Sequence, residues 1–192
     1  MKTKRVPTFV GYLTQSALLT CAVLVLGMTA FGQNRAWTST GSTGTVDEAD
    51  LAIAELNNFV YGLKAGSTGT VHVRFNITAT EDIGKYCPAT QSTIKVRFRD
   101  SDGAGTNHSV RFTLRRTMLA TGGNTVLYTF DSDAQGFPAD SAFRTATVTP
   151  AIDFDFANSV YWIEAEVTRS VASAYAHLGS IQIYENSGAA CP

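Results

Sequence analysis

The strongest constraint on the fold is a repeated alternation of apolar and polar residues with a period of two. In residues 70–80 every second residue is apolar, from Val71 to Ala79. The same alternation recurs in residues 94–99 and 110–115, on either side of a polar turn at residues 100–107. Successive side chains of a strand point to opposite faces, so this pattern is typical of half-buried strands. We predict a strand at residues 70–80 and a hairpin from the other two segments.

Further short segments rich in β-branched and aromatic residues follow at close spacing. We predict additional strands at residues 126–130, 143–148, 152–156, 160–168 and 180–184. Short strands separated by turn residues such as Gly122-Gly123 favour an all-β fold. We therefore predict a single antiparallel β-sandwich, for which a jelly roll is one candidate arrangement.

Residues 45–57 allow two interpretations. Thr45 and Glu48 have the spacing of a capping box, and the segment that follows is rich in helix formers. Alternation from Leu51 to Leu63, and Gly62 within it, favour two short strands separated at Asn57-Asn58 instead. We predict the two strands and keep the helix as the alternative.

The N-terminus has the features of a signal peptide. Lys2, Lys4 and Arg5 form a positive head, and residues 17–28 form an apolar run that is too short to span a bilayer. Small residues at Ala30 and Gly32 match a peptidase site. We predict a cleaved signal peptide at residues 1–32, a single domain at residues 33–192, and a secreted or periplasmic mature protein that does not span the membrane.

Composition after cleavage limits the partners of the mature chain. It would hold 12 basic and 16 acidic residues, a net charge of −4. Nucleic-acid binding depends on a basic surface, so we expect no nucleic-acid partner. Cys87 and Cys191 would be its two cysteines, and in an oxidising compartment we predict that they form a disulfide bond.

Three short tracts carry a resemblance to other sequences. They are Arg74-Phe75-Asn76, Phe130-Asp131-Ser132 and residues 161–165, Tyr-Trp-Ile-Glu-Ala. In this order they resemble a group of uncharacterised secreted bacterial β-rich proteins, over most of the chain after residue 32. The resemblance implies export and a β-sandwich-like fold, and it implies no activity.

The search for catalytic residues finds one pair of carboxylates. His72, His108 and His177 lie outside any recognisable catalytic motif, in a strand, a turn and a loop respectively. Glu164 and Glu166 lie two residues apart on a predicted strand and share a face, as the two acids of a retaining glycoside hydrolase would need. The alternative is that they form cross-strand ion pairs with Arg97, Arg111 or Arg115.

Two acidic turns resemble parts of calcium loops, one at residues 100–107 and one that begins at Asp131. Asp131, Asp133 and Gln135 reproduce the first half of such a loop, but Ala142 stands where the closing glutamate would be. Asp and Asn also favour turns through their backbone geometry. We therefore predict no metal and no cofactor, with those three residues as weak calcium candidates.

A cationic face is the remaining candidate site. Six basic residues would point away from the core on three strands, near Trp162; they are Arg74, Lys95, Arg97, Arg99, Arg111 and Arg115. An exposed ring beside charged groups suits a sugar surface. Our leading hypothesis is a non-catalytic binding or adhesion module for polysaccharide or another envelope component, with Trp162, Glu164, Glu166, Arg97, Arg111 and Arg115 as binding residues. A structural envelope or matrix subunit and a glycoside hydrolase are the alternatives.

Overall fold

The computed structural model describes residues 36–58, 60–80 and 92–185, and these form two antiparallel β-sheets. The predicted signal peptide and both Cys87 and Cys191 lie outside the described residues. No helix in the described part of the chain is long and apolar enough to cross a membrane. The strands are β1 (Trp37–Thr40), β2 (Thr45–Val46), β3 (Ala54–Asn57), β4 (Val60–Leu63), β5 (Gly69–Ile77), β6 (Ser92–Asp100), β7 (His108–Met118), β8 (Asn124–Asp131), β9 (Arg144–Val148), β10 (Ser159–Arg169) and β11 (Ala176–Glu185).

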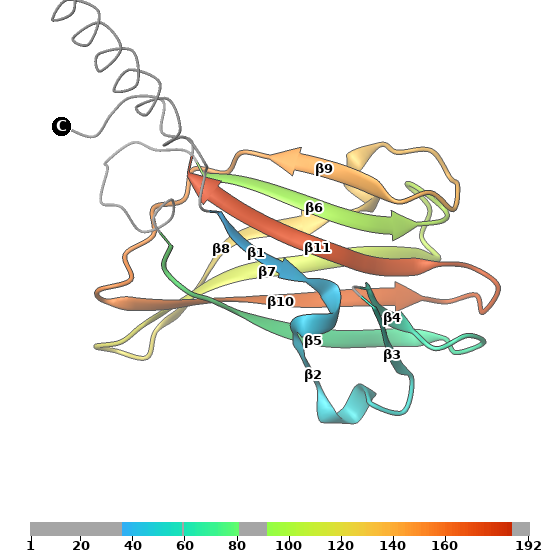
Figure 1. Ribbon diagram of the computed structural model, residues 1–192, viewed down its shortest axis with the longest axis horizontal. Coiled ribbons are helices and arrows are strands. Elements are labelled where there is room, and N and C mark those ends of the chain that lie inside the picture. Colours follow the sequence, from blue (N-terminus) through green and yellow to red (C-terminus); the bar gives the residue numbers. More distant parts are fainter. Residues whose placement is uncertain (1–35, 59, 81–91, 186–192) are drawn as a thin grey trace, which may run out of the picture. The chain divides into compact units, whose positions relative to one another are not determined.

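The strand order is that of a jelly roll. Sheet A has the order β3-β4-β11-β6-β9, with β1 also paired to β11, and sheet B has the order β2-β5-β10-β7-β8. From β4 to β11 the chain passes from one sheet to the other at every step except β7 to β8, so four strands of each sheet face four of the other (Figure 1). The predicted all-β sandwich is confirmed, and so is the jelly-roll arrangement.

The core lies between the sheets and is built by the alternation seen in the sequence. On β10 the residues Tyr161, Ile163, Ala165 and Val167 are almost fully buried, whereas the residues between them reach the outer face of sheet B. Burial of each large apolar side chain contributes about 1.5–3 kcal/mol. The same pattern holds along β5, β6 and β7, which explains why these segments form strands.

The predicted hairpin between residues 94–99 and 110–115 is wrong. Both segments are strands, β6 and β7, but β6 pairs with β11 and β9, whereas β7 pairs with β10 and β8. The intervening turn therefore carries the chain from sheet A to sheet B. Alternation determines which side chains face the core, and it does not determine which strand is the neighbour.

The predicted strand at residues 152–156 is also wrong. Ile152 and Phe154 are buried, as the alternation suggested, but the segment has no ladder partner. The Asp155 carboxylate accepts hydrogen bonds from the N–H groups of Ala157 and Asn158, which turns the chain before β10. An apolar residue at every second position can thus be buried by a loop.

The ambiguous segment before residue 58 contains short strands, as predicted. Thr45 does not begin an α-helix, because Asp47 caps a single 3₁₀ turn, η3 (Glu48–Asp50), by accepting from the Ala49 N–H at 3.0 Å. Strands β3 and β4 then form a hairpin whose turn includes Asn58, with a φ of 53°. Asparagine tolerates this left-handed conformation better than most residues.

Candidate functional site

The predicted binding residues do not all lie on one surface. Trp162, Glu164 and Glu166 share the outer face of sheet B on β10, and Arg111 and Arg115 lie beside them on β7. Arg97 belongs to β6 in sheet A, on the opposite side of the sandwich. Placing Arg97 in this group followed from the incorrect β6–β7 hairpin. The six cations of the predicted face are in fact divided between the two sheets.

The groups around Trp162 on sheet B interact mainly with one another. The guanidinium groups of Arg74 and Arg115 lie 5.9 and 5.4 Å from the centre of the Trp162 ring. The same two arginines form ion pairs with Glu164, at 3.4 and 3.5 Å. The Trp162 indole N–H donates to the Thr117 hydroxyl at 3.3 Å. Strands on both sides of β10 therefore already supply partners for its ring and for one of the two predicted glutamates.

The weak calcium candidates have partners within the protein as well. Arg111 forms ion pairs with Asp131 at 2.8 Å and with Asp133 at 3.5 Å. The side-chain amide of Gln135 donates to the Asp131 carbonyl at 3.0 Å, which closes a turn. Among the described residues, no group of three or more His, Cys, Asp or Glu side chains is arranged to hold a metal ion.

A cavity of about 210 Å³ lies on the outer face of sheet A. Its lining comes from the β3–β4 hairpin, from β6 and β11, and from the residue before β9. We call it the sheet A cavity, and the residues around it are Glu55, Asn57, Asn58, Val60, Arg99, Phe143 and His177.

The strand register explains why these residues meet. Glu55 lies opposite Gly62, Gly62 opposite His177, and His177 opposite Arg99. The β6–β9 pairing places Phe98 opposite Arg144, so continuing it by one residue brings Phe143 opposite Arg99. One row across the sheet therefore collects a carboxylate, an imidazole, a guanidinium and an aromatic ring from different parts of the chain.

Two glycines leave space beside residues that line this cavity. A Cβ atom at Gly62 would lie 2.5 Å from the His177 ring, so only glycine leaves room for the imidazole in this position. The register between β6 and β11 shifts at Gly179, where a Cβ would lie 3.0 Å from the Arg97 carbonyl oxygen and 3.5 Å from the Phe143 ring. Bulges of this kind often occur next to binding sites, because they re-aim neighbouring side chains.

Aromatic rings hold the two arginines of β6 in place. The Arg99 guanidinium lies 3.8 Å from the centre of the Tyr175 ring, and that of Arg97 lies 5.3 Å from the centre of the Phe143 ring. His177 stacks between the rings of Phe143 and Tyr175, with centre-to-centre distances of 6.4 and 6.0 Å. The cavity wall is therefore ordered before any ligand arrives, which lowers the entropic cost of binding.

Two polar atoms at this cavity have no hydrogen-bond partner among the described residues. The Arg99 Nε and the His177 Nδ1 are both buried, and neither forms a hydrogen bond. Burial and the positive charges of Arg99 and Arg169 lower the pKa of His177 to about 4, so the imidazole is neutral at physiological pH. Buried polar groups normally have partners, so these two atoms are unusual among the polar atoms near the cavity.

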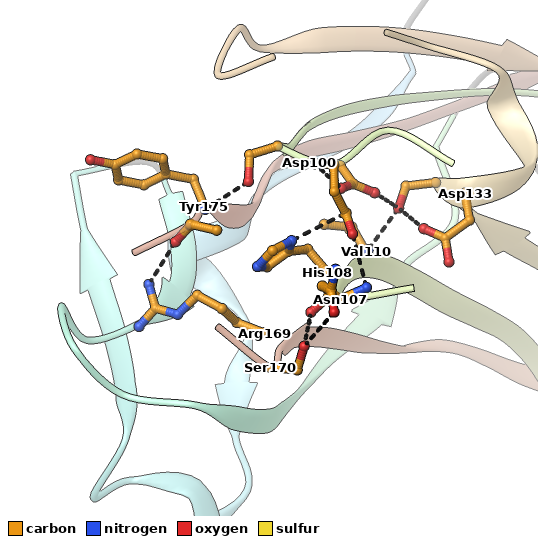
Figure 2. Close-up of polar contacts among 12 residues, drawn as sticks. Asp100, Asn107, His108, Val110, Asp133, Arg169, Ser170 and Tyr175 are labelled. Carbon is orange, nitrogen blue, oxygen red and sulfur yellow. Dashed lines mark hydrogen bonds and ion pairs between the residues drawn. The ribbon is translucent and has the colours of Figure 1, made fainter. Parts of the chain in front are cut away.

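A polar network, which is buried at Asp100 and Ser132, lies next to Tyr175 in the structure. The Tyr175 N–H donates to the Ser101 hydroxyl at 3.0 Å, which fixes the backbone next to the Tyr175 ring (Figure 2). Next to Ser101, the Asp100 carboxylate accepts a hydrogen bond of 2.5 Å from the Ser132 hydroxyl. His108 lies at 3.2 Å from Asp102 in the same region. His108 begins β7 and is buried, although the sequence suggested a turn.

The sequence did not single out most of these cavity residues. His177 was predicted to lie in a loop, but it is part of β11, and Phe143 and Glu55 were not considered as site residues. A local signal existed for Gly62, because a glycine within an alternating strand often marks a close approach. The sequence predicted that Arg99 points away from the core, but it did not predict that Arg99 contacts Tyr175 or lines a cavity with His177.

Fold and cavity together define a jelly-roll β-sandwich with an open polar and aromatic site on one sheet. No protein-family model and no curated protein matches the chain. Among solved structures, a family 35 carbohydrate binding module from an environmental isolate is similar at 14% identity and a TM-score of 0.34, over 81% of this chain and 99% of that one. The carbohydrate recognition domain of Emp46p is similar at 11% identity and a TM-score of 0.38, over 77% and 95%.

An exo-β-1,3-galactanase from Phanerochaete chrysosporium is similar at 11% identity and a TM-score of 0.36, over 78% of this chain. This chain spans 29% of the length of that enzyme. With TM-scores below 0.5, these likenesses carry no argument about what the chain binds. The function has to be argued from the site itself.

Proposed function

We propose that this protein is an exported, non-catalytic module that binds polysaccharide, and that the sheet A cavity is its binding site. The observation that carries the proposal is the row of side chains across sheet A. It combines an aromatic ring, Phe143, with polar groups from Glu55 and Arg99 around an open hollow. A sugar presents an apolar face and a rim of hydroxyl groups, which this combination complements.

The small size of the cavity supports a polymeric ligand of which a single sugar unit occupies the cavity. Its volume of about 210 Å³ is smaller than the roughly 300 Å³ at which pockets for drug-sized molecules begin. Asn57 and Asn58 on its rim are exposed, so the remainder of a chain can continue along the surface. Their amides can both donate and accept, as hydroxyl groups require.

The positions of the candidate catalytic glutamates also support a binding module. Glu164 on sheet B is engaged by two arginines, and Glu55 faces the sheet A cavity from the other side of the sandwich. The pair that a glycoside hydrolase would use is thus not part of the cavity. Export is proposed from the N-terminal sequence, and N-terminal sequencing of the mature protein from the native host is expected to begin at Gln33.

A glycan-array screen of the mature protein tests the binding proposal. Phe143→Ala should abolish the signal, and Trp162→Ala should retain it. The second variant is a matched control, because it also removes an aromatic ring from the outer face of a sheet, but from sheet B. Thermal melting of both variants establishes that they fold. Absence of any binding signal for the wild-type protein would refute glycan binding. Loss of binding in Trp162→Ala alone would show that the site lies on sheet B instead.

A further inference from the structure

Three cations of β6 lie on the outer face of sheet A without an ion pair to any other described residue. Lys95, Arg97 and Arg99 alternate with core residues along the strand, so all three point away from the core. Each lies instead against an aromatic ring: Lys95 against Tyr184 at 5.2 Å, and the two arginines against Phe143 and Tyr175. We call these three residues the β6 cation stripe.

The arginines on the outer face of sheet B are different, because each has an acidic partner. Arg74 and Arg115 pair with Glu164, and Arg111 pairs with Asp131. Positive charge on sheet B is therefore neutralised within the protein. The β6 cation stripe has no acidic partner among residues 36–58, 60–80 and 92–185, even though the mature chain as a whole would be acidic.

The strands on either side of β6 explain this difference. At the positions that flank the stripe, β9 and β11 present neutral side chains, which are Thr145 and Thr147 on β9 and His177, Ser180 and Gln182 on β11. Glu55 is the nearest acid in the row across the sheet, and it stands on the far wall of the cavity, two strands from β11. The His177 imidazole contributes no charge at physiological pH.

Geometry along β6 suits a ligand that carries several negative charges in line. Alternate residues of a strand lie about 6.6–6.8 Å apart, so the stripe presents three cations at regular intervals. Its first position, Arg99, lies in the cavity with a buried Nε that has no hydrogen-bond partner. A guanidinium held against a ring is well suited to paired hydrogen bonds with a carboxylate or sulfate.

We propose that the ligand of this site is an acidic polysaccharide whose chain runs along β6. An acidic sugar occupies the sheet A cavity with its anionic group on Arg99, and the anionic groups of the following sugars meet Arg97 and Lys95. Glu55 and the hairpin amides contact the uncharged hydroxyl rim of the first sugar. This inference rests on the proposed glycan-binding function and specifies the class of glycan.

The test uses four immobilised polysaccharides and the mature protein. Polygalacturonate carries only carboxylates, dextran sulfate carries only sulfates, heparin carries both, and dextran is the neutral counterpart of dextran sulfate. We expect binding to at least one acidic polymer and at least about tenfold weaker binding to dextran, with affinity falling as salt is added because exposed charges are screened. Whether the carboxylated or the sulfated polymers bind more tightly identifies the anionic group.

Variants on the two sheets locate the contact. Arg99→Gln should weaken binding by about tenfold to about a hundredfold, since a charged hydrogen bond at a partly buried position is lost. Arg97→Gln and Lys95→Gln, at more open positions, should each weaken it by about two- to fivefold. Arg74→Gln on sheet B removes the same single positive charge as Arg99→Gln does, and it should leave the affinity unchanged. Melting temperatures exclude unfolding as the cause.

The possible failures are distinguishable. Equal binding to dextran and the acidic polymers, unaffected by the Arg97 and Lys95 variants, would overturn the acidic ligand and leave glycan binding intact. Equal loss in Arg74→Gln and Arg97→Gln would show attraction to net charge alone and would overturn the stripe. No binding to any polymer, together with a silent glycan array, would overturn both proposals.

Discussion

Replacing Asp100 by asparagine should stabilise this protein at neutral and alkaline pH. Asp100 ends β6, is 5% exposed, and joins the two sheets by accepting from the Ser132 hydroxyl. Ser132 in turn accepts a hydrogen bond from the Val110 N–H at 2.9 Å. Asparagine keeps an oxygen for Ser132 and removes the negative charge. It also replaces the second oxygen, which accepts from the Asp102 N–H at 3.3 Å, by an N–H₂ group that can donate to the Asp102 carboxylate.

The size of the effect follows from the pKa of the Asp100 carboxyl group. Burial raises this pKa from 3.8 to about 7, with the Ser132 hydrogen bond opposing the rise and Asp102 adding to it. The folded state therefore holds the proton more tightly than the unfolded chain. The free energy of unfolding is highest below the unfolded pKa of 3.8 and falls as the pH rises to about 7. At about 1.4 kcal/mol per pKa unit, the loss amounts to roughly 4 kcal/mol.

Urea denaturation of wild type and Asp100→Asn at several pH values measures this difference. Taking the difference between the two proteins cancels the contributions of groups whose pKa does not depend on Asp100, and the pKa values of Asp102 and Asp133 do depend on it. We expect the variant to be more stable by about 2–4 kcal/mol at about pH 8, with the gap closing towards about pH 4.5. A variant that is less stable than wild type at about pH 8 would refute the reasoning, because it would show that the folded protein needs the ionised Asp100.

Three further predictions concern two residues near the cavity and the pair of cysteines. The pKa of His177 is lowered from 6.5 to about 4, so the free energy of unfolding of the wild type should fall as the pH falls from 6.5 to about 4. The free energy of unfolding of His177→Gln should fall less over the same range, and an equal fall in both proteins, measured by urea denaturation, would contradict this. Gly62→Ala would place a Cβ 2.5 Å from the His177 ring and should cost about 1–3 kcal/mol in the free energy of unfolding, whereas Gly123→Ala in a turn should cost less. The disulfide bond that the sequence predicts between Cys87 and Cys191 should leave no free thiol in unreduced protein that lacks residues 1–32, and a reactive thiol in a denatured sample would disprove it.

Much of the fold could be predicted from local pattern alone. Alternation located β5, β6, β7 and β10 and identified which of their side chains face the core, because a strand has only two faces. Neighbouring strands were not predictable in the same way. The turn after Asp100 looks like a hairpin loop in the sequence, and only the packing of two sheets shows that it joins one layer to the other.

The site was harder to predict than the fold, because its residues are assembled by register. Glu55 and His177 are 122 positions apart in the sequence, and Gly62 between them in the sheet makes them neighbours in one row. No local motif surrounds either residue. The bulge at Gly179 lies against Phe143 and the absence of a side chain at Gly62 leaves room for His177, and both effects depend on strands that lie far apart in the chain.

The cations of β6 and β7 show most clearly what local pattern leaves open. Both strands alternate basic residues with core residues, and the sequence predicts the same outward orientation for both. On sheet B the neighbouring β10 supplies Glu164 and the end of β8 supplies Asp131, so Arg111 and Arg115 become parts of ion-pair networks. On sheet A the strands beside β6 supply hydroxyls, an amide and a neutral imidazole. Within the described part of the chain, the same alternation therefore yields a neutralised surface on one sheet and unpaired charge beside a cavity on the other, and the difference follows from the strand order.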